Sequence, residues 1–415
     1  MNRLLFKNIK TLYGVYETVP TVRKGVDLAV VPEIHEAWLA IEDGRIVDFG
    51  EMNQFPGIAD WKGLEIVDCS GSIIFPTFSD SHTHIVYDGN RAGEFTDRIK
   101  GLTYEEIANK GGGILNSARN LRLASEDSLF EQARGRFLEI IRLGTGAVEI
   151  KSGYGLDLAS ELKMLRVIQR LRNLNLIPVK ATFLGAHAIP PEFKGNKEGY
   201  LNLIVNEMLP VIAQEGLADY IDIFCEQGYF TPEDTMRVLE AGAKFGLKGK
   251  VHAEQMSHSK GIQVGVKCQA VSVDHLEYCN AEDINCLAES TTIPTILPGA
   301  AYFLSLPNPP AREMIKGGLP IAIASDYNPG SSPTGNMKLM MSIACVQYRM
   351  TPQEAFNAST INSAYAMGLE EEVGSITRGN RANFVVSSSA GSLDELAYAF
   401  GSFHTDKVYV NGQLF

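Results

Sequence analysis

The chain has 415 residues, of which 45% are hydrophobic and 21% charged, and its formal net charge is −12. This length predicts one large domain with an appendage and a sizeable buried core. The acidic balance, without a cluster of Lys and Arg, argues against nucleic acid as the main partner. No apolar stretch is long enough to span a bilayer, which argues against a membrane protein.

The cysteines and the first residues bear on the compartment. The six cysteines form no CxxC pair, and several lie inside apolar segments, which is typical of reduced thiols in an intracellular protein. The apolar run before Lys7 is only three residues long, too short for the core of a signal peptide. We therefore expect a cytoplasmic protein.

Both ends of the chain have the character of short strands joined by turns. Residues 36–50 place two apolar runs on either side of an Asp-Gly pair, which is a hairpin signal. Residues 407–415 contain an Asn-Gly turn of the same kind. We expect the two ends, residues 1–74 and 373–415, to pair as one small β-sandwich domain.

The middle of the chain alternates short apolar runs with longer segments whose apolar residues recur at helical spacing. The eight runs are residues 72–84, 146–155, 177–187, 220–226, 248–255, 270–277, 291–300 and 320–330. The clearest helical segments are residues 128–144, 159–175 and 231–246, each ending near a Gly or Asn stop signal. This alternation predicts an α/β fold, a (β/α)8 TIM-like barrel over residues 75–372. An open doubly wound sheet is the alternative, disfavoured by the count of eight and by the lack of a GxGxxG turn after the first strand.

Polar side chains gather at the C-terminal ends of these runs, the face on which barrel enzymes build their active sites. Five of the eight histidines lie there: His82, His84, His187, His252 and His275. His82 and His84 stand two residues apart on a strand and so share a face. Three imidazoles and a carboxylate suit a borderline divalent ion with one position open for water. We predict a metal centre on His82, His84, His252 and Asp326.

This ligand set predicts hydrolytic chemistry. A metal so held lowers the pKa of its bound water to about 7. Asp326 can contact the metal and take the proton from that water, while His275 can polarise the carbonyl under attack or hold the hydroxide. A second metal usually needs a bridging anion; a carbamylated Lys151 could in principle serve, but it ends the second strand, so one metal is favoured. Glu226 stays open between hydrogen bonds that support the metal ligands and a structural ion pair.

The loop after the first strand carries Arg91. Arginine binds a carboxylate bidentately, so Arg91 predicts an anionic substrate. Tyr104, Tyr154 and His187 are placed to join it.

Several segments resemble one known family. They are HTH, GGGILNSARN, EIKSGYGL, TFLGAHAIPPEF, HAEQ, DHLE, LPGAAYFL, SDYNPGSSPTGN and TPQEAFNASTINSAYAMG. HTH is shared by many members of the amidohydrolase superfamily, whereas KSGYGL with GAHAIPPE and NPGSSP is specific to the imidazolonepropionases. The resemblance covers nearly the whole chain. It implies hydrolysis of the ring amide of 4-imidazolone-5-propanoate to N-formimidoyl-L-glutamate, in histidine degradation, by a cytoplasmic homodimer.

The resemblance also implies roles for single residues. It implies one Zn²⁺ or Fe ion per chain on the four predicted ligands, and it makes His275 catalytic. It places the small, carboxylate-bearing imidazolone substrate against Arg91, Tyr104, Tyr154, His187, Asn328, Gly330 and Ser331.

Two positions depart from the family pattern. Some relatives carry a proton-transferring glutamate three residues after the strand-five histidine, where this chain has Gln255. We therefore expect Asp326 and His275 to move the proton, with the adjacent Glu254 as a further catalytic candidate and Gln255 at the substrate. In the loop before Arg91, Asp88 adds a negative charge that could alter the aim of the arginine.

Two alternatives remain open at this point. A deaminase of the same superfamily, acting on a cytosine- or guanine-like ring, would use nearly the same chemistry, and the requirement for Arg91 distinguishes the two. A non-catalytic barrel used as a scaffold would not need metal ligands, whereas the full set is present here.

Overall fold

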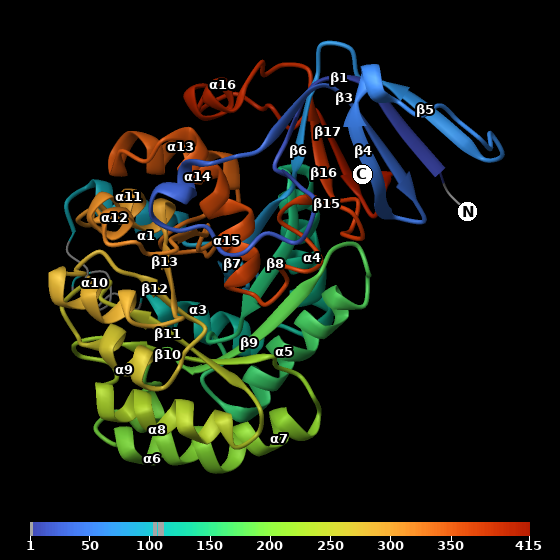
Figure 1. Cartoon of the computed structure of the whole chain (residues 1–415). Helices are drawn as coiled ribbons and strands as arrows, with labels where there is room; N and C mark the ends of the chain where they lie inside the picture. Colours follow the sequence, from blue (N-terminus) through green and yellow to red (C-terminus); the bar gives the residue numbers. More distant parts are fainter. Residues whose placement is uncertain (1–2, 103–105, 107–111) are drawn as a thin grey trace.

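The computed structural model of the chain describes residues 3–102, 106 and 112–415. A barrel surrounded by helices forms the larger part, and a β-rich domain lies at one side of it (Figure 1). Both ends of the chain lie in the β-rich domain, so the barrel is an insertion between two segments that pair with each other.

Eight parallel strands form the barrel, in the order in which they occur along the chain. They are β7 (Phe78–Thr83), β8 (Thr145–Lys151), β9 (Val179–Ala186), β10 (Tyr220–Cys225), β11 (Lys248–Ala253), β12 (Ser272–His275), β13 (Ile293–Ile296) and β14 (Ala322–Ile323). Each falls inside one of the eight predicted runs, except that β8 begins one residue before its run. The runs are nearly continuously apolar because strands of a parallel barrel are buried on both faces.

Two hydrogen bonds close the barrel between the first strand and the chain that follows the eighth. The amide of Asp326 donates to the carbonyl of His82 over 2.9 Å, and the amide of His84 donates to the carbonyl of Tyr327 over 2.9 Å. The predicted TIM-like barrel is thus confirmed. Closure brings the loops after β7 and β14, which are about 240 residues apart in sequence, into direct contact.

Helices cover the outside of the barrel, and their starts follow local capping signals. The side chains of Ser125, Asp157 and Thr231 accept hydrogen bonds from amides in the first turns of α4, α5 and α8. The α-helices are α1 (Ala92–Ile99), α3 (Ile114–Leu123), α4 (Glu126–Arg142), α5 (Leu158–Arg172), α6 (Lys197–Leu203), α7 (Leu209–Gln214), α8 (Pro232–Ala243), α9 (Gly261–Lys267), α10 (Ala281–Ala288), α11 (Pro298–Leu304), α12 (Ala311–Lys316), α13 (Met337–Tyr348), α14 (Pro352–Ser359), α15 (Ile361–Tyr365) and α16 (Leu393–Tyr398). Short helical turns are η1 (Gly25–Ala29), η2 (Met52–Gln54), η3 (Pro191–Phe193) and η4 (Ile204–Met208), the last of which is π-helical.

The β-rich domain is built from both ends of the chain. Its main sheet runs β18-β17-β16-β6-β1-β3-β4, with β5 also paired to β1, and β2 pairs separately with β15. The strands are β1 (Arg3–Tyr13), β2 (Val15–Tyr16), β3 (Glu33–Glu42), β4 (Arg45–Glu51), β5 (Leu64–Asp68), β6 (Ile73–Pro76), β15 (Ile376–Thr377), β16 (Phe384–Ser387), β17 (Lys407–Val410) and β18 (Gln413–Leu414). Both residues of the Asp43-Gly44 turn have positive φ, as its predicted hairpin requires. The predicted pairing of the two chain ends is therefore confirmed.

The chain passes from the β-rich domain to the barrel at Thr77, between β6 and β7. One part of the N-terminal segment leaves the sheet and packs on the barrel helices instead. There the side chain of Asn357 on α14 donates to the carbonyls of Leu28 and Val30, at 2.9 and 3.0 Å. The two domains are thus tied together by polar contacts as well as by the chain crossing.

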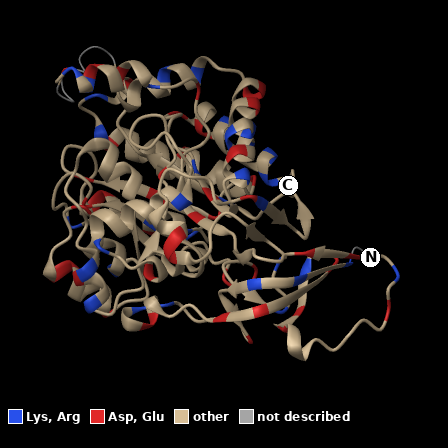
Figure 2. Ribbon diagram, turned by 90° about the horizontal axis from the view of Figure 1, so that it is seen from above, with Lys and Arg blue, Asp and Glu red and all other residues tan. Residues whose placement is uncertain are grey.

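Figure 2 shows basic and acidic residues interspersed over the described part of the molecule. Within the described ranges, none of the helices has the length and apolar character needed to cross a bilayer.

Candidate metal centre and substrate cavity

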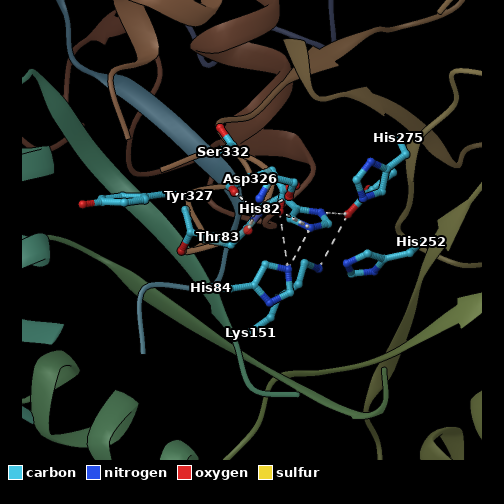
Figure 3. A network of polar contacts seen from close by, with 12 residues as sticks. His82, Thr83, His84, Lys151, His252, His275, Asp326, Tyr327 and Ser332 are labelled. Carbon is cyan, nitrogen blue, oxygen red and sulfur yellow. Dashed lines mark hydrogen bonds and ion pairs between the residues drawn. The ribbon is translucent and has the colours of Figure 1, made fainter. Parts of the chain in front are cut away.

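Three buried histidines converge at the C-terminal end of the barrel. His82 and His84 come from the end of β7 and His252 from the end of β11. One nitrogen from each ring can be chosen so that all three atoms lie within 4.8 Å of one another. Figure 3 shows these rings gathered in one place with His275 and Asp326 beside them. The tertiary fold thus brings together the three predicted imidazole ligands from strands far apart in sequence.

Carboxylates behind the rings fix which nitrogen faces the centre. Nδ1 of His82 lies 2.6 Å from Asp274 Oδ2, and Nδ1 of His252 lies 3.0 Å from Asp222 Oδ2. The Nε2 atom of His82 is therefore left to face His84, at 3.2 Å. Such a carboxylate behind a histidine is the usual support of a metal-ligating imidazole.

The donor set fits a metal ion. Nε2 of His252 is buried and has no hydrogen-bond partner among the described residues. Burial lowers the pKa of His82 and of His84 well below the usual value, so both rings are neutral, the form that binds metal. A cation among these nitrogens would satisfy lone pairs that the protein leaves without donors.

Asp326 lies at the edge of this cluster. Its Oδ1 atom is 3.5 Å from His82 Nε2 and 3.6 Å from His84 Nε2, and its Oδ2 accepts from the hydroxyl of Ser331 over 3.2 Å. Its φ of 52° lies in the left-handed region, which is costly for a non-glycine residue and is common at functional sites. The backbone is bent at the position where the sequence places the fourth ligand.

A cavity of about 360 Å³ opens over the cluster. Most of the predicted substrate-binding residues line it. Its walls include His84, Arg91, Glu94, Arg98, Tyr154, His187, His252, Gln255, His275, Asp326, Asn328, Gly330 and Ser331. One cavity therefore joins the histidine cluster to cationic and hydroxyl side chains.

The cationic part of the cavity contains two arginines. Arg91 is paired with Glu94, with Nε and Nη2 at 2.8 and 2.6 Å from Oε2. Arg98, which sequence reasoning missed, donates from Nη2 to the carbonyl of Gly330 over 3.2 Å. A side chain at Gly330 would collide with the Arg91 guanidinium, which a built Cβ would approach to 2.1 Å. This glycine therefore allows the arginine to lie against the loop after β14.

Tyr154 and His187 lie in the loops after β8 and β9, the two strands that follow β7 in the barrel. The Glu161 carboxylate accepts from the amides of Gly153, Gly155 and Leu156 at 2.8 to 3.1 Å and so holds the loop that carries Tyr154. His187 Nδ1 lies 3.0 Å from the carbonyl of Gly153 in the same loop. Burial raises the pKa of Tyr154, so its hydroxyl keeps its proton and can donate to an anion.

The loop after β14 is preorganised by Asn328. Its Oδ1 accepts from the amides of Gly330 and Ser331, both at 2.8 Å, and its Nδ2 donates to the Ser331 hydroxyl over 2.6 Å. Three predicted substrate residues therefore form one rigid turn at the cavity wall.

The neighbours Glu254 and Gln255 were both predicted as site residues, and they lie in different places. Gln255 lines the cavity, but the Glu254 carboxylate accepts from the amides of Gly261 and Ile262 at the start of α9, at 2.9 and 3.1 Å, and does not line the cavity. Tyr104 lies outside the described residues. Asp88 accepts from Gln132 Nε2 over 2.7 Å, so it has its own partner beside the arginine loop.

The question of Glu226 is answered by its contacts. Its carboxylate accepts from the amides of Gln227 and Met256, both at 2.8 Å, and from the hydroxyl of Ser257. These bonds tie the loop after β10 to the loop after β11. Within the described part of the chain, these contacts include neither a bond to a predicted metal ligand nor an ion pair.

A layer of charge below the histidines is the main feature that sequence reasoning missed. Lys151 Nζ lies 2.7 Å from Glu149 Oε1 and 2.8 Å from Asp222 Oδ2, and Lys250 also pairs with Glu149; all four side chains are fully buried. Burial alone would lower the pKa of Lys151, but the surrounding carboxylates raise it above the usual value. The signal was visible as charged residues inside apolar runs, such as VEIK and YIDIF. Lys151 is thus an ion-pair partner here.

The chain is similar to known proteins over nearly its whole length. The amidohydrolase family matches residues 73–415. A relative from Flavobacterium johnsoniae, named imidazolonepropionase, is 53% identical over 410 residues, covering 99% of each chain. Relatives of the same name from Christiangramia forsetii and Shewanella oneidensis are 53% and 44% identical, covering 99% and 92% of this chain and 99% and 93% of their own.

Solved structures show the fold at much lower identity. E. coli guanine deaminase has a TM-score of 0.75 at 15% identity, covering 100% of this chain and 99% of its own. A triazine hydrolase variant has a TM-score of 0.74 at 16% identity, covering 99% and 94%. These similarities support the barrel with its β-rich domain and carry no information about the substrate.

Proposed function

The chain belongs to the amidohydrolase family and, within it, to the imidazolonepropionases, and from this premise we propose that it hydrolyses the ring amide of 4-imidazolone-5-propanoate to N-formimidoyl-L-glutamate in histidine degradation. The observation that carries the proposal is one cavity that opens over three buried imidazoles and has guanidinium groups in its wall. The imidazoles can hold a metal ion for amide hydrolysis, and the guanidinium groups can bind the propanoate carboxylate.

We assign the metal to His82, His84, His252 and Asp326, as one Zn²⁺ or Fe ion per chain. When bound, such an ion polarises the carbonyl of the scissile amide and acidifies a water molecule. The carboxylates of Asp274 and Asp222 hold His82 and His252 with Nε2 available. This support makes the site rigid before the ion arrives.

Proton transfer falls to Asp326 and His275. Among the described residues, the carboxylates that line the cavity are Asp326 and Glu94, and Glu94 already accepts from Arg91 and from the amide of Gly113. Asp326 is therefore the carboxylate free to take the proton of the attacking water. Gln255 occupies the cavity wall as a neutral hydrogen-bonding group.

His275 is suited to hydrogen bonding at the reacting carbonyl. Its ring centroid lies 5.3 Å from that of His252 and 5.6 Å from that of His82. Burial lowers its pKa to about 4, so the ring is neutral at pH 7. A neutral imidazole donates one hydrogen bond without adding a second cation beside the metal.

The substrate carboxylate is assigned to the arginine side of the cavity. Arg91 and Arg98 supply the positive charge, and the loop of Asn328, Gly330 and Ser331 supplies hydrogen-bond donors. Tyr154 and His187 face this region from the loops after β8 and β9. A ring without a carboxylate would leave these buried donors unpaired, which lowers affinity.

The direct test is an assay with freshly prepared 4-imidazolone-5-propanoate, followed by its absorbance and by detection of formimidoylglutamate. We expect turnover that stops after chelation and returns with Zn²⁺ or Fe, and no release of ammonia from guanine or cytosine. Metal content should be about one ion per chain, and should be lost in His252→Ala but kept in His258→Ala, whose ring is 37% exposed and lies outside the cluster. Absence of formimidoylglutamate from the metal-loaded protein would exclude the proposal.

The compartment, the domain bounds and the oligomeric state are also proposals. We infer a cytoplasmic homodimer, with a barrel domain over residues 75–372 between two segments of the β-rich domain. Light scattering of the purified protein should give twice the chain mass of 45.4 kDa; a single-chain mass would contradict the dimer.

A further inference from the structure

Glu277, two residues beyond His275, is an unusual carboxyl group. Its side chain is 1% exposed, and neither carboxyl oxygen has a hydrogen-bond partner among the described residues. A buried polar group left without a partner costs on the order of 1–3 kcal/mol, and more if it is charged. Glu277 takes no part in the hydrogen bonds of the metal centre, and it does not line the cavity.

The nearest complementary atom belongs to His275. Oε1 of Glu277 lies 3.6 Å from His275 Nδ1, which is also buried and also without a hydrogen-bond partner. A small side-chain rotation would bring the two atoms within hydrogen-bond distance. Each group is the natural partner of the other.

The backbone holds this pair together at a cost. His275 has a φ of 92° and Leu276 a φ of 74°, both in the left-handed region that non-glycine residues avoid. The amide of Leu276 donates to the carbonyl of Ala253 over 3.1 Å, and the Leu276 side chain is fully buried. Tertiary contacts therefore enforce a turn that puts His275 and Glu277 side by side, as expected where strain serves a site.

The surroundings of Glu277 favour its protonated form. Burial raises its pKa well above the usual value, and the nearby Glu226 raises it further. The hydroxyl of Tyr348 on α13 is also buried and also lacks a hydrogen-bond partner among the described residues. Burial raises the pKa of Tyr348, and the nearby Glu277 raises it further. As a carboxylic acid, Glu277 is a hydrogen-bond donor.

We propose that Glu277 is a positioning residue, which donates a hydrogen bond from its carboxyl group to Nδ1 of His275 and so keeps the imidazole proton on Nε2. The Nε2–H group then points into the cavity, where it donates to the carbonyl oxygen of the scissile amide. This inference rests on the proposed hydrolysis. It adds a residue that acts through His275 without touching the substrate.

Two variants of similar size separate positioning from a structural role. Glu277→Gln keeps a donor for Nδ1 and cannot ionise, so kcat should stay within about threefold of the wild type. Glu277→Leu removes the donor, and kcat should fall about 10- to 100-fold, the usual effect of losing a supporting hydrogen bond, with KM within threefold. Leu removes a buried carboxyl group but leaves the buried Nδ1 of His275 without a donor, so the two effects offset each other and Tm should stay within about 5 °C of the wild type.

A loss of activity with little change in Tm and unchanged metal content is the signature of positioning. The inference is overturned if Glu277→Leu keeps kcat within twofold, or if its activity falls together with metal content or with a fall in Tm of more than about 5 °C. Nitrogen-15 NMR of the His275 ring gives an independent readout in the metal-loaded wild type, where the proton should be on Nε2. A proton on Nδ1 would also overturn it. Failure of the proposed hydrolysis is distinguishable, because the wild type itself would then be inactive.

Discussion

Nδ1 of His82 lies 2.6 Å from Oδ2 of Asp274, and both side chains are fully buried. The carboxylate accepts the ring proton, so it holds one tautomer and one ring orientation at the metal centre. Asp274 receives a second bond from the hydroxyl of Ser272, at 2.6 Å, which fixes the carboxylate in turn. The geometry of the predicted ligand is thus determined by a residue on another strand.

The first prediction concerns this support. Asp274→Asn should lower the affinity for Zn²⁺ about 10- to 100-fold, because an amide cannot hold His82 in the same way as a carboxylate. Competition with a fluorescent chelator measures the affinity. Asp283→Asn, a change to a buried carboxylate that caps α10 away from the cavity, serves as the control for general destabilisation; equal loss of metal in both variants would contradict the prediction.

The second prediction concerns the buried charge layer. Lys151→Met leaves the carboxylates of Glu149 and Asp222 without their shared cation, so the free energy of unfolding should fall by about 3–5 kcal/mol. Urea unfolding measures it. The matched control is Arg166→Met, which removes a pair with Glu215 whose arginine side chain is 46% exposed and should cost less than about 1 kcal/mol. A small effect at Lys151 would show that the layer relaxes or takes up water.

The third prediction is that Arg98 binds the carboxylate of the substrate. Arg91 is already paired with Glu94, whereas the described contacts of Arg98 are neutral: the Gly330 carbonyl and the ring of Phe303. Arg98→Gln should therefore raise KM for 4-imidazolone-5-propanoate by about tenfold or more, the worth of a charge-assisted hydrogen bond.

The control for that experiment is the propanamide form of the substrate. Its KM should change little between the wild type and Arg98→Gln, because it lacks the carboxylate. An equal rise in KM for both substrates would mean that Arg98 shapes the cavity without contacting the carboxylate.

The fourth prediction concerns the loop that carries Tyr154. Glu161→Gln replaces one of the oxygens that accept from the amides of Gly153, Gly155 and Leu156 by a donor. The loop should loosen, raising KM severalfold and lowering the free energy of unfolding by about 1–3 kcal/mol. Glu198→Gln, with a side chain 71% exposed on α6, should change neither quantity. An unchanged KM would separate the loop from substrate binding.

The fifth prediction concerns pH. Burial raises the pKa of Cys225 to about 12, and those of Cys69 and Cys345 to about 11, from 9.0. Between pH 9 and 11 the unfolded chain loses thiol protons that the folded chain keeps, so the stability present below pH 9 decreases as pH rises. Cys225→Ala should make this decrease shallower in urea titrations at pH 8 to 10.5. Wild type and variant with parallel pH curves would contradict the assignment.

The sequence by itself determined the architecture and much of the site. Eight apolar runs predicted the eight barrel strands, and the Asp43-Gly44 pair predicted a hairpin because only a few residue types tolerate positive φ. His82 and His84 could be placed on one face because the strand period is local. These inferences depend on short-range backbone geometry, which a linear sequence contains.

Only the tertiary structure decided the partnerships across the barrel. Glu254 and Gln255 are neighbours in sequence, yet Gln255 lines the cavity and Glu254 binds the start of α9. Lys151 looked like a candidate metal-bridging residue, and the fold pairs it with Asp222 on another strand. Which buried charges meet depends on the stagger and closure of eight strands, and the energy of each pair is set by the burial that closure creates.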